Sequence, residues 1–493
     1  MPKKTIKSRR SFLKVTGLGY LAAAGGFRRV ARASALEGVA VAGIGIGGKG
    51  SGDIHHAGRY GKVVALCDVD RNLLAGEAQN FPDARTFIDY RELFAEMGDK
   101  VDAVTVGTAD HTHAPITAAA LKLKKHCYTQ KPLTRTIGEA RALGRLAKEN
   151  GVCTQMGNQG SNGIKFRQLV AQIQAGALGE VTEVIARTNR PIWPQGPDRR
   201  MTLERFIEQT KAENADEPEL ADEEIAEKKK QIEGALRQLS WSDWLGPAAK
   251  REFWPGLYHS FVWRGWWDFG TGSLGDMGCH ELNLPFTGAS LRHPSSVVAM
   301  TSGHDFDSFP ARSICRYQFP ANDSRGPVTL TWYDASQALD PELIEKYHLP
   351  EKGWVSATIG TKGCMTSDGT FIDRDGNAME PLPESALEYP VPPREDGTND
   401  GDQLHKLEWF TAIWEGKPQL CWSNFPDHAG PLTEMVLLGN LAVWGASQPD
   451  VWGEEIQWDD QTLTITNLSE LKTPGYEQLV RPVYQNGYEQ LEM

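Results

Sequence analysis

A glycine-rich turn followed by an acidic residue is the first pattern that could do chemistry. Gly43, Gly45 and Gly48 fit the spacing G-x-G-x-x-G, between an apolar run at 39–43 and a helical segment. We expect Gly43 to permit a tight turn, Gly45 a close backbone approach to a diphosphate, and Gly48 close packing of helix on strand. The helix N-terminus then offers N–H groups to the phosphates. Asp68 follows the next apolar run, about where a ribose ligand is expected.

The charge of Asp68 bears on which dinucleotide would bind. A carboxylate beside the adenosine ribose repels a 2′-phosphate, so NAD is favoured as the cofactor. Arg71 lies close enough in the sequence to accommodate that phosphate, which leaves NADP open.

Lys131, Asp276 and His280 could supply acid–base chemistry. Oxidation of a secondary alcohol needs a base within hydrogen-bond reach of the hydroxyl while hydride moves to a nicotinamide. His280, whose ordinary pKa is near neutrality, is the candidate base. Asp276 precedes it by one helical turn, and either binds substrate hydroxyls or holds the imidazole. Lys131 would stabilise the developing alkoxide and contact the cofactor ribose.

Three ordered motifs resemble the Gfo/Idh/MocA oxidoreductases, the family of glucose–fructose oxidoreductase and inositol dehydrogenase. They are the glycine turn, residues 102–132, and residues 270–280, of which the last is similar to the family signature G-x-x-x-D-x-G-x-H. The middle motif ends in Gln130-Lys131-Pro132, where the family usually has Glu-Lys-Pro. Because Gln130 replaces that glutamate, the role of the glutamate in the family, such as orienting the lysine, is in question for this chain.

The resemblance implies residue roles and a reaction. Thr108, His113 and Lys131 would lie near the cofactor, while Asp276 and His280 would line the substrate site against the nicotinamide. The expected activity is an NAD(P)-dependent oxidation of a CH–OH group in a sugar, glycoside or polyol. We expect His113 to serve a positioning or structural role.

A cluster of tryptophans favours a carbohydrate substrate. Seven of the 15 tryptophans fall between Trp193 and Trp267. Sugar rings present apolar C–H faces that stack on indole, although most of these rings are expected to pack between domains. Trp266 and Trp267, beside Arg264, are the best candidates for substrate contact. Asn158 follows the last strand of the first domain and is also expected to face the cleft.

Three functions stay open at this stage. The first is the sugar or polyol oxidoreductase. The second keeps the fold but uses tightly bound NAD for transient oxidation and elimination, which makes a glycosidase with no net redox change. The third is a non-catalytic sugar-binding or scaffold protein, which the filled acid–base positions disfavour.

Residues 1–35 have the pattern of a twin-arginine export signal. Arg9-Arg10 is followed by Phe-Leu-Lys, a weakly apolar stretch at 15–27 and small residues around Ala33. We therefore expect a periplasmic or otherwise exported protein that meets the twin-arginine translocase. That stretch is too short to span a bilayer, so no membrane contact is expected of the mature form. No nicotinamide pool is expected outside the inner membrane, so the cofactor should be held tightly.

Charge and cysteine content exclude other classes. Cleavage after Ala33 would remove nine Lys or Arg and no acid, taking the formal charge from -12 to -21. Such an acidic surface argues against nucleic acid as a partner. The seven cysteines are scattered without a C-x-x-C pair, so we interpret them as buried small hydrophobes and expect no metal site.

The elements that must position these residues suggest two α/β domains. Alternating apolar runs and helical segments predict a doubly wound parallel Rossmann sheet over 36–160. Residues 161–493 predict an α+β substrate or oligomerisation domain with a largely antiparallel sheet, and relatives suggest a homo-oligomer. An acidic segment at about 201–238 is expected to be a solvated helical insertion or, alternatively, a partner contact.

Overall fold

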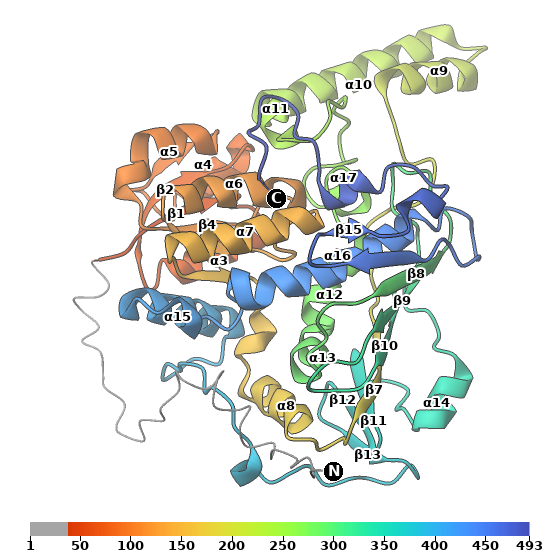
Figure 1. The fold of residues 1–493 in the computed structure, drawn as a ribbon. Helices are drawn as coiled ribbons and strands as arrows, with labels where there is room; N and C mark the ends of the chain where they lie inside the picture. The colour runs from red at the N-terminus through yellow and green to blue at the C-terminus, as the bar shows by residue number, and fades with distance from the viewer. Residues whose placement is uncertain (1–37, 493) are drawn as a thin grey trace, which may run out of the picture.

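A computed structural model describes residues 38–492 and shows two sheets with helices packed around them (Figure 1). The expected export signal, residues 1–35, lies outside the described residues.

The first domain is a six-stranded parallel sheet in the order β3-β2-β1-β4-β5-β6. Its apolar runs are buried on both faces, as in β1, where Val41 and Ala42 are fully buried. The strands are β1 (Ala40–Ile44), β2 (Lys62–Cys67), β3 (Arg85–Phe87), β4 (Ala103–Val106), β5 (His126–Thr129) and β6 (Thr154–Met156). The connecting helices are α3 (Lys49–Ala57), α4 (Arg71–Ala78), α5 (Tyr90–Met97), α6 (Asp110–Lys122) and α7 (Ile137–Asn150). The predicted Rossmann sheet is confirmed.

A helix from the far end of the chain completes this domain. Trp409 and Phe410 of α15 (Gly401–Glu415) are fully buried in the cluster that contains Val41 and Tyr128. The opposite face of the sheet packs against α5, α6 and α7. The first domain therefore depends on residues about 250 positions beyond its own last strand, as the bond between Trp409 Nε1 and the Cys153 carbonyl shows (3.1 Å, 256 residues apart).

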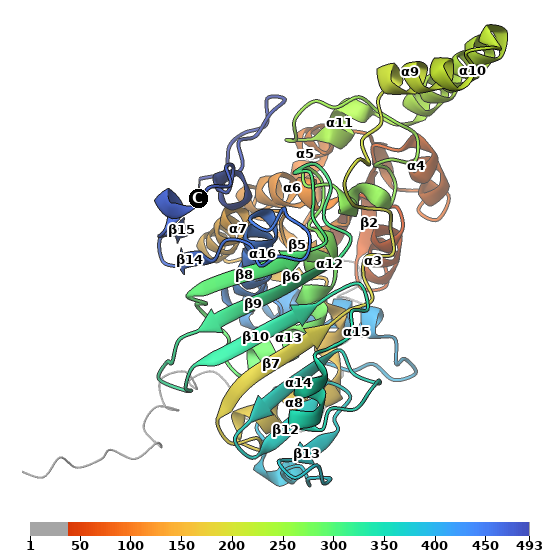
Figure 2. The same cartoon turned by 90° about the vertical axis from the view of Figure 1, so that its right-hand side faces the viewer.

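The second domain is a nine-stranded mixed sheet in the order β13-β12-β11-β7-β10-β9-β8-β14-β15 (Figure 2). The β7–β10 pair is parallel and the other pairs are antiparallel, which confirms a largely antiparallel sheet. The strands are β7 (Val181–Arg187), β8 (Ser296–Thr301), β9 (Ser313–Phe319), β10 (Val328–Tyr333), β11 (Ser356–Gly360), β12 (Gly363–Thr366), β13 (Phe371–Asp373), β14 (Ile456–Asp459) and β15 (Thr464–Ile465).

One face of this sheet carries the helices that reach the first domain. The buried helix α16 packs against α7, α12 and β8. The remaining helices of the second domain are α8 (Ile164–Gln174), α11 (Trp241–Leu245), α12 (Gly272–Glu281), α13 (Asn283–Gly288), α14 (Pro341–Tyr347), α16 (Gly430–Trp444) and α17 (Glu477–Val480).

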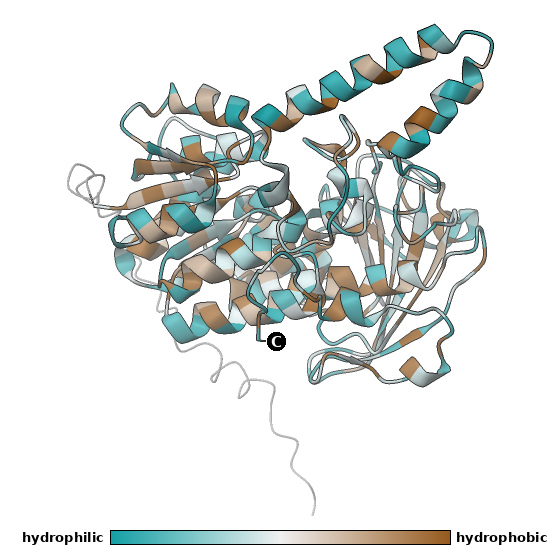
Figure 3. Ribbon diagram, turned by 90° about the horizontal axis from the view of Figure 1, so that it is seen from above, coloured by the Kyte–Doolittle hydropathy of each residue, from teal (hydrophilic) through white to brown (hydrophobic). Residues whose placement is uncertain are grey.

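The acidic segment forms a helical hairpin that projects from the body. It consists of α9 (Leu203–Glu213) and α10 (Pro218–Gln238), and Figure 3 shows both mainly hydrophilic. Only Thr210, Ala221 and Ile225 are buried in these two helices. Near its base, Phe206 contacts Trp254 with ring centroids 5.3 Å apart.

The cysteines are all buried and unpaired, as the sequence indicated. Over residues 38–492, no group of three His, Cys, Asp or Glu side chains is arranged to hold a metal ion. In the same described range, no helix is both long and apolar enough to cross a membrane.

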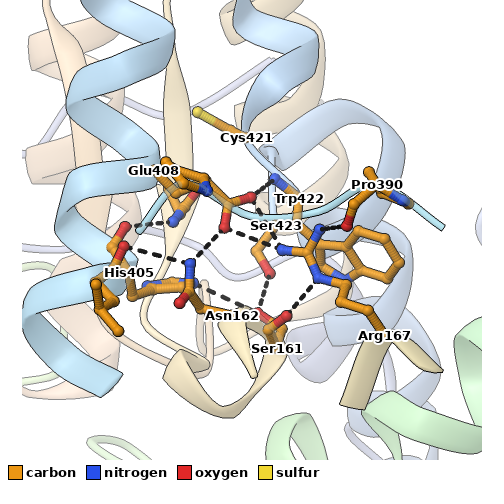
Figure 4. Close-up of polar contacts among 12 residues, drawn as sticks. Ser161, Asn162, Arg167, Pro390, His405, Glu408, Cys421, Trp422 and Ser423 are labelled. Atoms are coloured by element: carbon orange, nitrogen blue, oxygen red, sulfur yellow. Dashed lines mark hydrogen bonds and ion pairs between the residues drawn. The ribbon is translucent and has the colours of Figure 1, made fainter. Parts of the chain in front are cut away.

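A buried ion pair joins the two domains (Figure 4). Arg167 of α8 donates through Nη2 to both carboxylate oxygens of Glu408 in α15, at 3.1 and 3.0 Å. The Trp422 N–H and the Asn162 amide satisfy the same carboxylate at 2.8 and 2.9 Å. The guanidinium also lies over the Trp422 ring, 3.9 Å from its centroid. Because both charges are almost inaccessible to water, each depends on the other for compensation.

This pair predicts a stability effect. Glu408→Gln leaves the Arg167 charge buried without its counter-charge, so the free energy of unfolding should fall by about 3–5 kcal/mol. Denaturant titration followed by circular dichroism measures the change. Glu415→Gln, at the exposed end of the same helix, is the control and should change stability by less than about 1 kcal/mol. Equal effects of the two substitutions would contradict the role given to Glu408.

Candidate active site

The glycine turn joins β1 to α3 and lines a cavity of about 570 Å³. Gly45 has φ +71°, and a Cβ there would lie 2.5 Å from Thr108 Cγ2, so only glycine fits. Gly48 has φ +53° and faces open space, with α3 starting at the next residue. A diphosphate would meet the free N–H groups at this helix end.

The close packing expected of Gly48 is made by Gly50 instead. A Cβ on Gly50 would lie 1.8 Å from the Gly45 carbonyl oxygen, whereas nothing lies within 4 Å of the position it would take on Gly48. Gly43 is limited by side chains, since its Cβ would meet Ile46 and Ile54 at 3.0 Å. The three glycines of the motif are in place, but the packing role assigned to Gly48 was wrong, because the part of α3 that approaches the turn most closely is Gly50.

The carboxylate of Asp68 lies against the glycine turn, where the adenosine ribose is expected. Its carboxylate accepts the N–H groups of Ile46 and Asp70, both at 2.9 Å, and it lines the cavity. Burial raises the pKa of Asp68 although those N–H groups oppose the shift. The acid is thus fixed beside the loop where a ribose hydroxyl would bind.

Lys131 and Asp276 meet across the two domains. Lys131 follows β5, and its Nζ donates to the Asp276 carbonyl at 2.6 Å and to Oδ1 at 2.9 Å. Asp276 also accepts from Arg190 and Arg264, each through Nε at 3.2 Å. Burial opposes ionisation of Asp276, but Lys131 and Arg264 outweigh it and lower its pKa.

His280 lies one turn beyond Asp276 on α12 and lines the same cavity as Lys131. Burial, reinforced by the charge of Lys131, lowers the pKa of His280 to about 3. The ring is therefore neutral at ordinary pH, and a neutral imidazole can accept a proton.

Thr108 and His113 connect the two loops that carry the site. The ring nitrogens of His113 lie 2.8 Å from the Pro132 carbonyl and 3.0 Å from the Thr108 carbonyl. Burial lowers the pKa of His113 to about 4. Both residues line the cavity, but the contacts of His113 give it a positioning role for the loop of Lys131.

Three residues expected at the substrate are elsewhere. Trp266 and Trp267 are 2% and 4% exposed and do not line the cavity. The indole Nε1 of Trp266 donates to the Leu257 carbonyl, and the ring of Trp267 stacks on that of Phe309 with centroids 3.7 Å apart. Asn158 is buried and accepts from Ser423 at 2.5 Å. Sequence neighbourhood suggested these positions, but the turn at 262–265 directs the two indoles into the core.

Other residues missed by the sequence do line the cavity. They are Trp244, His259, Phe261, Trp263 and, from the C-terminal tail, Tyr488. Arg264 lines it as expected, and so does Gln159, the neighbour of Asn158 in the sequence. The position of Tyr488 could not be predicted from the sequence, because no local pattern indicates that the C-terminal tail contacts the glycine turn.

Gln130 is turned away from Lys131. Its amide donates to Asp53 Oδ2 at 2.6 Å, and Lys406 contacts the other oxygen at 2.7 Å. Asp53 and Lys406 are almost fully buried, so the amide helps to satisfy an enclosed carboxylate. Gln130 thus supports the wall of the cavity and does not orient Lys131.

Comparison with known proteins gives family matches in both domains. Residues 38–158 match the NAD-binding Rossmann-fold model of the Gfo/Idh/MocA oxidoreductases, and residues 225–291 match the model of the C-terminal alpha/beta domain of that family. The second match contains Asp276 and His280.

Curated relatives align with part of the chain. Inositol 2-dehydrogenase of Rubrobacter xylanophilus is 32% identical over 110 residues, 22% of this chain and 31% of that protein. The 1,5-anhydro-D-fructose reductase of Ensifer adhaerens is 30% identical over 120 residues, 24% of this chain and 35% of that protein. The chain thus aligns with about a third of the length of these relatives.

A solved structure has a similar fold over most of the chain. Levoglucosan dehydrogenase in complex with NADH and levoglucosan has a TM-score of 0.50 and 15% identity, covering 84% of this chain and 98% of that one. Residues 38–158 and 225–291 are thus similar to the two domains of the Gfo/Idh/MocA oxidoreductases, and the glycine turn lies in the NAD-binding Rossmann domain.

Proposed function

We propose that this protein is an exported NAD-dependent oxidoreductase that removes hydride from a secondary alcohol of a sugar or polyol. One observation carries the proposal: Lys131 and His280, from different domains, line one cavity with the glycine turn and Asp68. Two relatives named for inositol and for an anhydro sugar support the substrate class.

The residues of the cavity fit a dinucleotide. Gly48 leaves open space before α3, and Asp68 is held at the ribose position. When bound, NAD supplies the nicotinamide that accepts hydride. The site therefore needs from the protein a proton acceptor and a charge that stabilises an alkoxide.

Three side chains supply that chemistry. His280 takes the hydroxyl proton, because burial keeps its ring neutral. Lys131 stabilises the negative charge that develops on the alcohol oxygen, and Asp276 holds its ammonium group at 2.9 Å. Asp276 is thereby a positioning residue for Lys131.

We also propose that the cofactor is retained between turnovers, because a strap formed by residues 239–264 covers its cavity. Ser240 N–H donates to the Val69 carbonyl at 2.9 Å, and His259 contacts Asp70 at 2.9 Å. The C-terminal tail, dark blue in Figure 1, holds the strap: Asn486 donates to the Gly246 carbonyl at 2.8 Å. Exit of the dinucleotide would require these contacts to open.

The contacts of the strap beside the cavity favour one second candidate, a glycosidase that oxidises a sugar carbon, eliminates the aglycone and returns the hydride. Such a reaction regenerates its bound cofactor in every cycle. It therefore suits a protein that is exported, as proposed from residues 1–35, to a compartment without a nicotinamide pool. A purely sugar-binding or scaffold role would not require Lys131 and His280.

A product assay tests the proposal. The mature protein is purified, its retained dinucleotide is measured by absorbance, and sugars, polyols and glycosides are screened for reduced cofactor and released aglycone. We expect His280→Ala to lower kcat by about 10²- to 10⁴-fold, because the base is lost. His293→Ala, an exposed ring outside the cavity, is the matched control. Aglycone release without net reduction would favour the glycosidase, and undiminished activity of His280→Ala would refute the catalytic assignment.

The neutral state of His280 can be observed directly. In protein labelled with ¹³C at histidine Cε1, the His280 resonance is identified by its loss in His280→Gln. It should not titrate between pH 5 and 8, because burial and Lys131 disfavour the imidazolium and lower the pKa to about 3. A titration midpoint near 6.5 would show that the ring is solvated and would contradict the geometry.

Asp68 should decide between the two nicotinamide dinucleotides. Asp68→Asn removes the charge that repels a 2′-phosphate, so the ratio of NADPH to NADH affinity should rise about tenfold or more. Fluorescence titration of protein stripped of dinucleotide measures both Kd values. Asp83→Asn, an exposed acid of the same domain, should leave the ratio unchanged. An unchanged ratio in Asp68→Asn would mean that selectivity comes from elsewhere.

A further inference from the structure

Three cations surround a single ionised carboxylate beside the cavity, which two of them, Lys131 and Arg264, line directly. Lys131 Nζ lies 2.9 Å from Asp276 Oδ1, Arg264 Nε lies 3.2 Å from the same oxygen, and Arg190 Nε lies 3.2 Å from Oδ2. We call these four residues the cationic cluster. Asp276 balances one of the three positive charges, so the cluster has a formal charge of +2.

The neighbouring carboxyl groups do not neutralise this excess. Asp110 is fully buried and accepts a hydrogen bond from Thr271 at 2.6 Å, and burial raises its pKa to about 7. Glu281 follows His280 on α12, and burial raises its pKa to about 8. Both groups are therefore largely protonated or only partly ionised at neutral pH. His280 is neutral and adds no charge of either sign.

Arg190 and Arg264 each bind Asp276 through Nε, so their Nη atoms can bind another partner. Arg264 Nη1 contacts the Phe261 carbonyl at 3.2 Å, and Arg190 Nη1 contacts Asn189 at 2.5 Å. Neither Nη2 atom has a hydrogen-bond partner in residues 38–492, and the two side chains are 22% and 24% exposed. They are thus accessible to a small ligand.

Aromatic rings fix the direction of the Arg264 guanidinium. It lies 4.2 Å from the centroid of Trp263 and 4.6 Å from that of Phe261. A stacked guanidinium loses little conformational freedom on binding, and its planar fork matches a carboxylate. The side chain is therefore prepared to bind an anion before one arrives.

The diphosphate of the cofactor would not occupy this position. Its expected site is the N-terminus of α3 after Gly48, whereas the cationic cluster is centred on α12, next to His280. An uncompensated charge of +2 on partly buried side chains is unfavourable. A negative group on the second ligand of the cavity, the substrate, would compensate it.

We infer that the substrate is a sugar acid, whose carboxylate binds between Arg190 and Arg264 while a ring hydroxyl faces His280. The inference rests on the proposed function and narrows its substrate class from sugars in general to uronic acids and their glycosides.

Matched pairs of compounds test the inference. Glucose and glucuronate, galactose and galacturonate, mannose and mannuronate, and their methyl glycosides are titrated into the protein loaded with NADH, with binding measured by calorimetry. Cofactor reduction is followed separately with NAD. In at least one pair, the acid should bind ten times or more tightly than the neutral sugar, and the advantage should shrink as salt increases.

Two variants locate the carboxylate. Arg264→Gln and Arg190→Gln should each reduce the acid-to-neutral affinity ratio about tenfold or more, because a charge-assisted hydrogen bond is lost. Arg316→Gln, on the exposed face of β9, should keep the ratio of the unchanged protein.

Several results would overturn the inference. Neutral sugars binding as well as, or better than, their acids in every pair would do so, while cofactor reduction by those sugars would leave the proposed function intact. Absence of both binding and reduction for every compound would count against both. Loss of retained dinucleotide from Arg264→Gln on desalting, with an unchanged affinity ratio, would place Arg264 on the diphosphate instead.

Discussion

The ion pair between Lys131 and Asp276 is the interaction on which the site depends. It joins a loop at the carboxyl end of the Rossmann sheet to a helix of the second domain, with Lys131 Nζ 2.6 Å from the Asp276 carbonyl. Separating the two domains would leave a largely buried carboxylate and its cationic neighbours without compensation, at a cost of about 3–5 kcal/mol for a broken buried pair. The same contact that holds the domains together therefore also sets His280 beside the cofactor cavity.

A second set of buried charges supports the opposite side of the junction. Arg167 and Glu408 pair there, and Lys406 compensates Asp53 at 2.7 Å. Gln130 belongs to this second set, because its amide completes the hydrogen bonding of Asp53. Burial of these groups makes their geometry specific, since any displacement would leave a charge unpaired in a medium that solvates it poorly.

Much of the fold could be predicted from local pattern. The strands Val181–Arg187, Ser296–Thr301 and Val328–Tyr333 are examples, because a run of apolar and β-branched residues between turns specifies a strand locally. Short elements such as β13 and α11 were not predicted, since three to five residues carry too weak a periodic signal. The position of α15 on the Rossmann sheet was also beyond local pattern, because its apolar surface specifies burial but not the partner.

By itself, the sequence determined the chemistry available: a glycine turn, an acid at the ribose, and a lysine, an aspartate and a histidine in recognisable motifs. These follow from residue type and spacing, which are local properties. Only the tertiary structure decided which side chains share the cavity, because that depends on contacts between segments far apart in the chain. It moved Trp266 and Trp267 into the core, added Arg190 to the carboxylate of Asp276, and brought Tyr488 from the last residues of the chain to the mouth of the cofactor site.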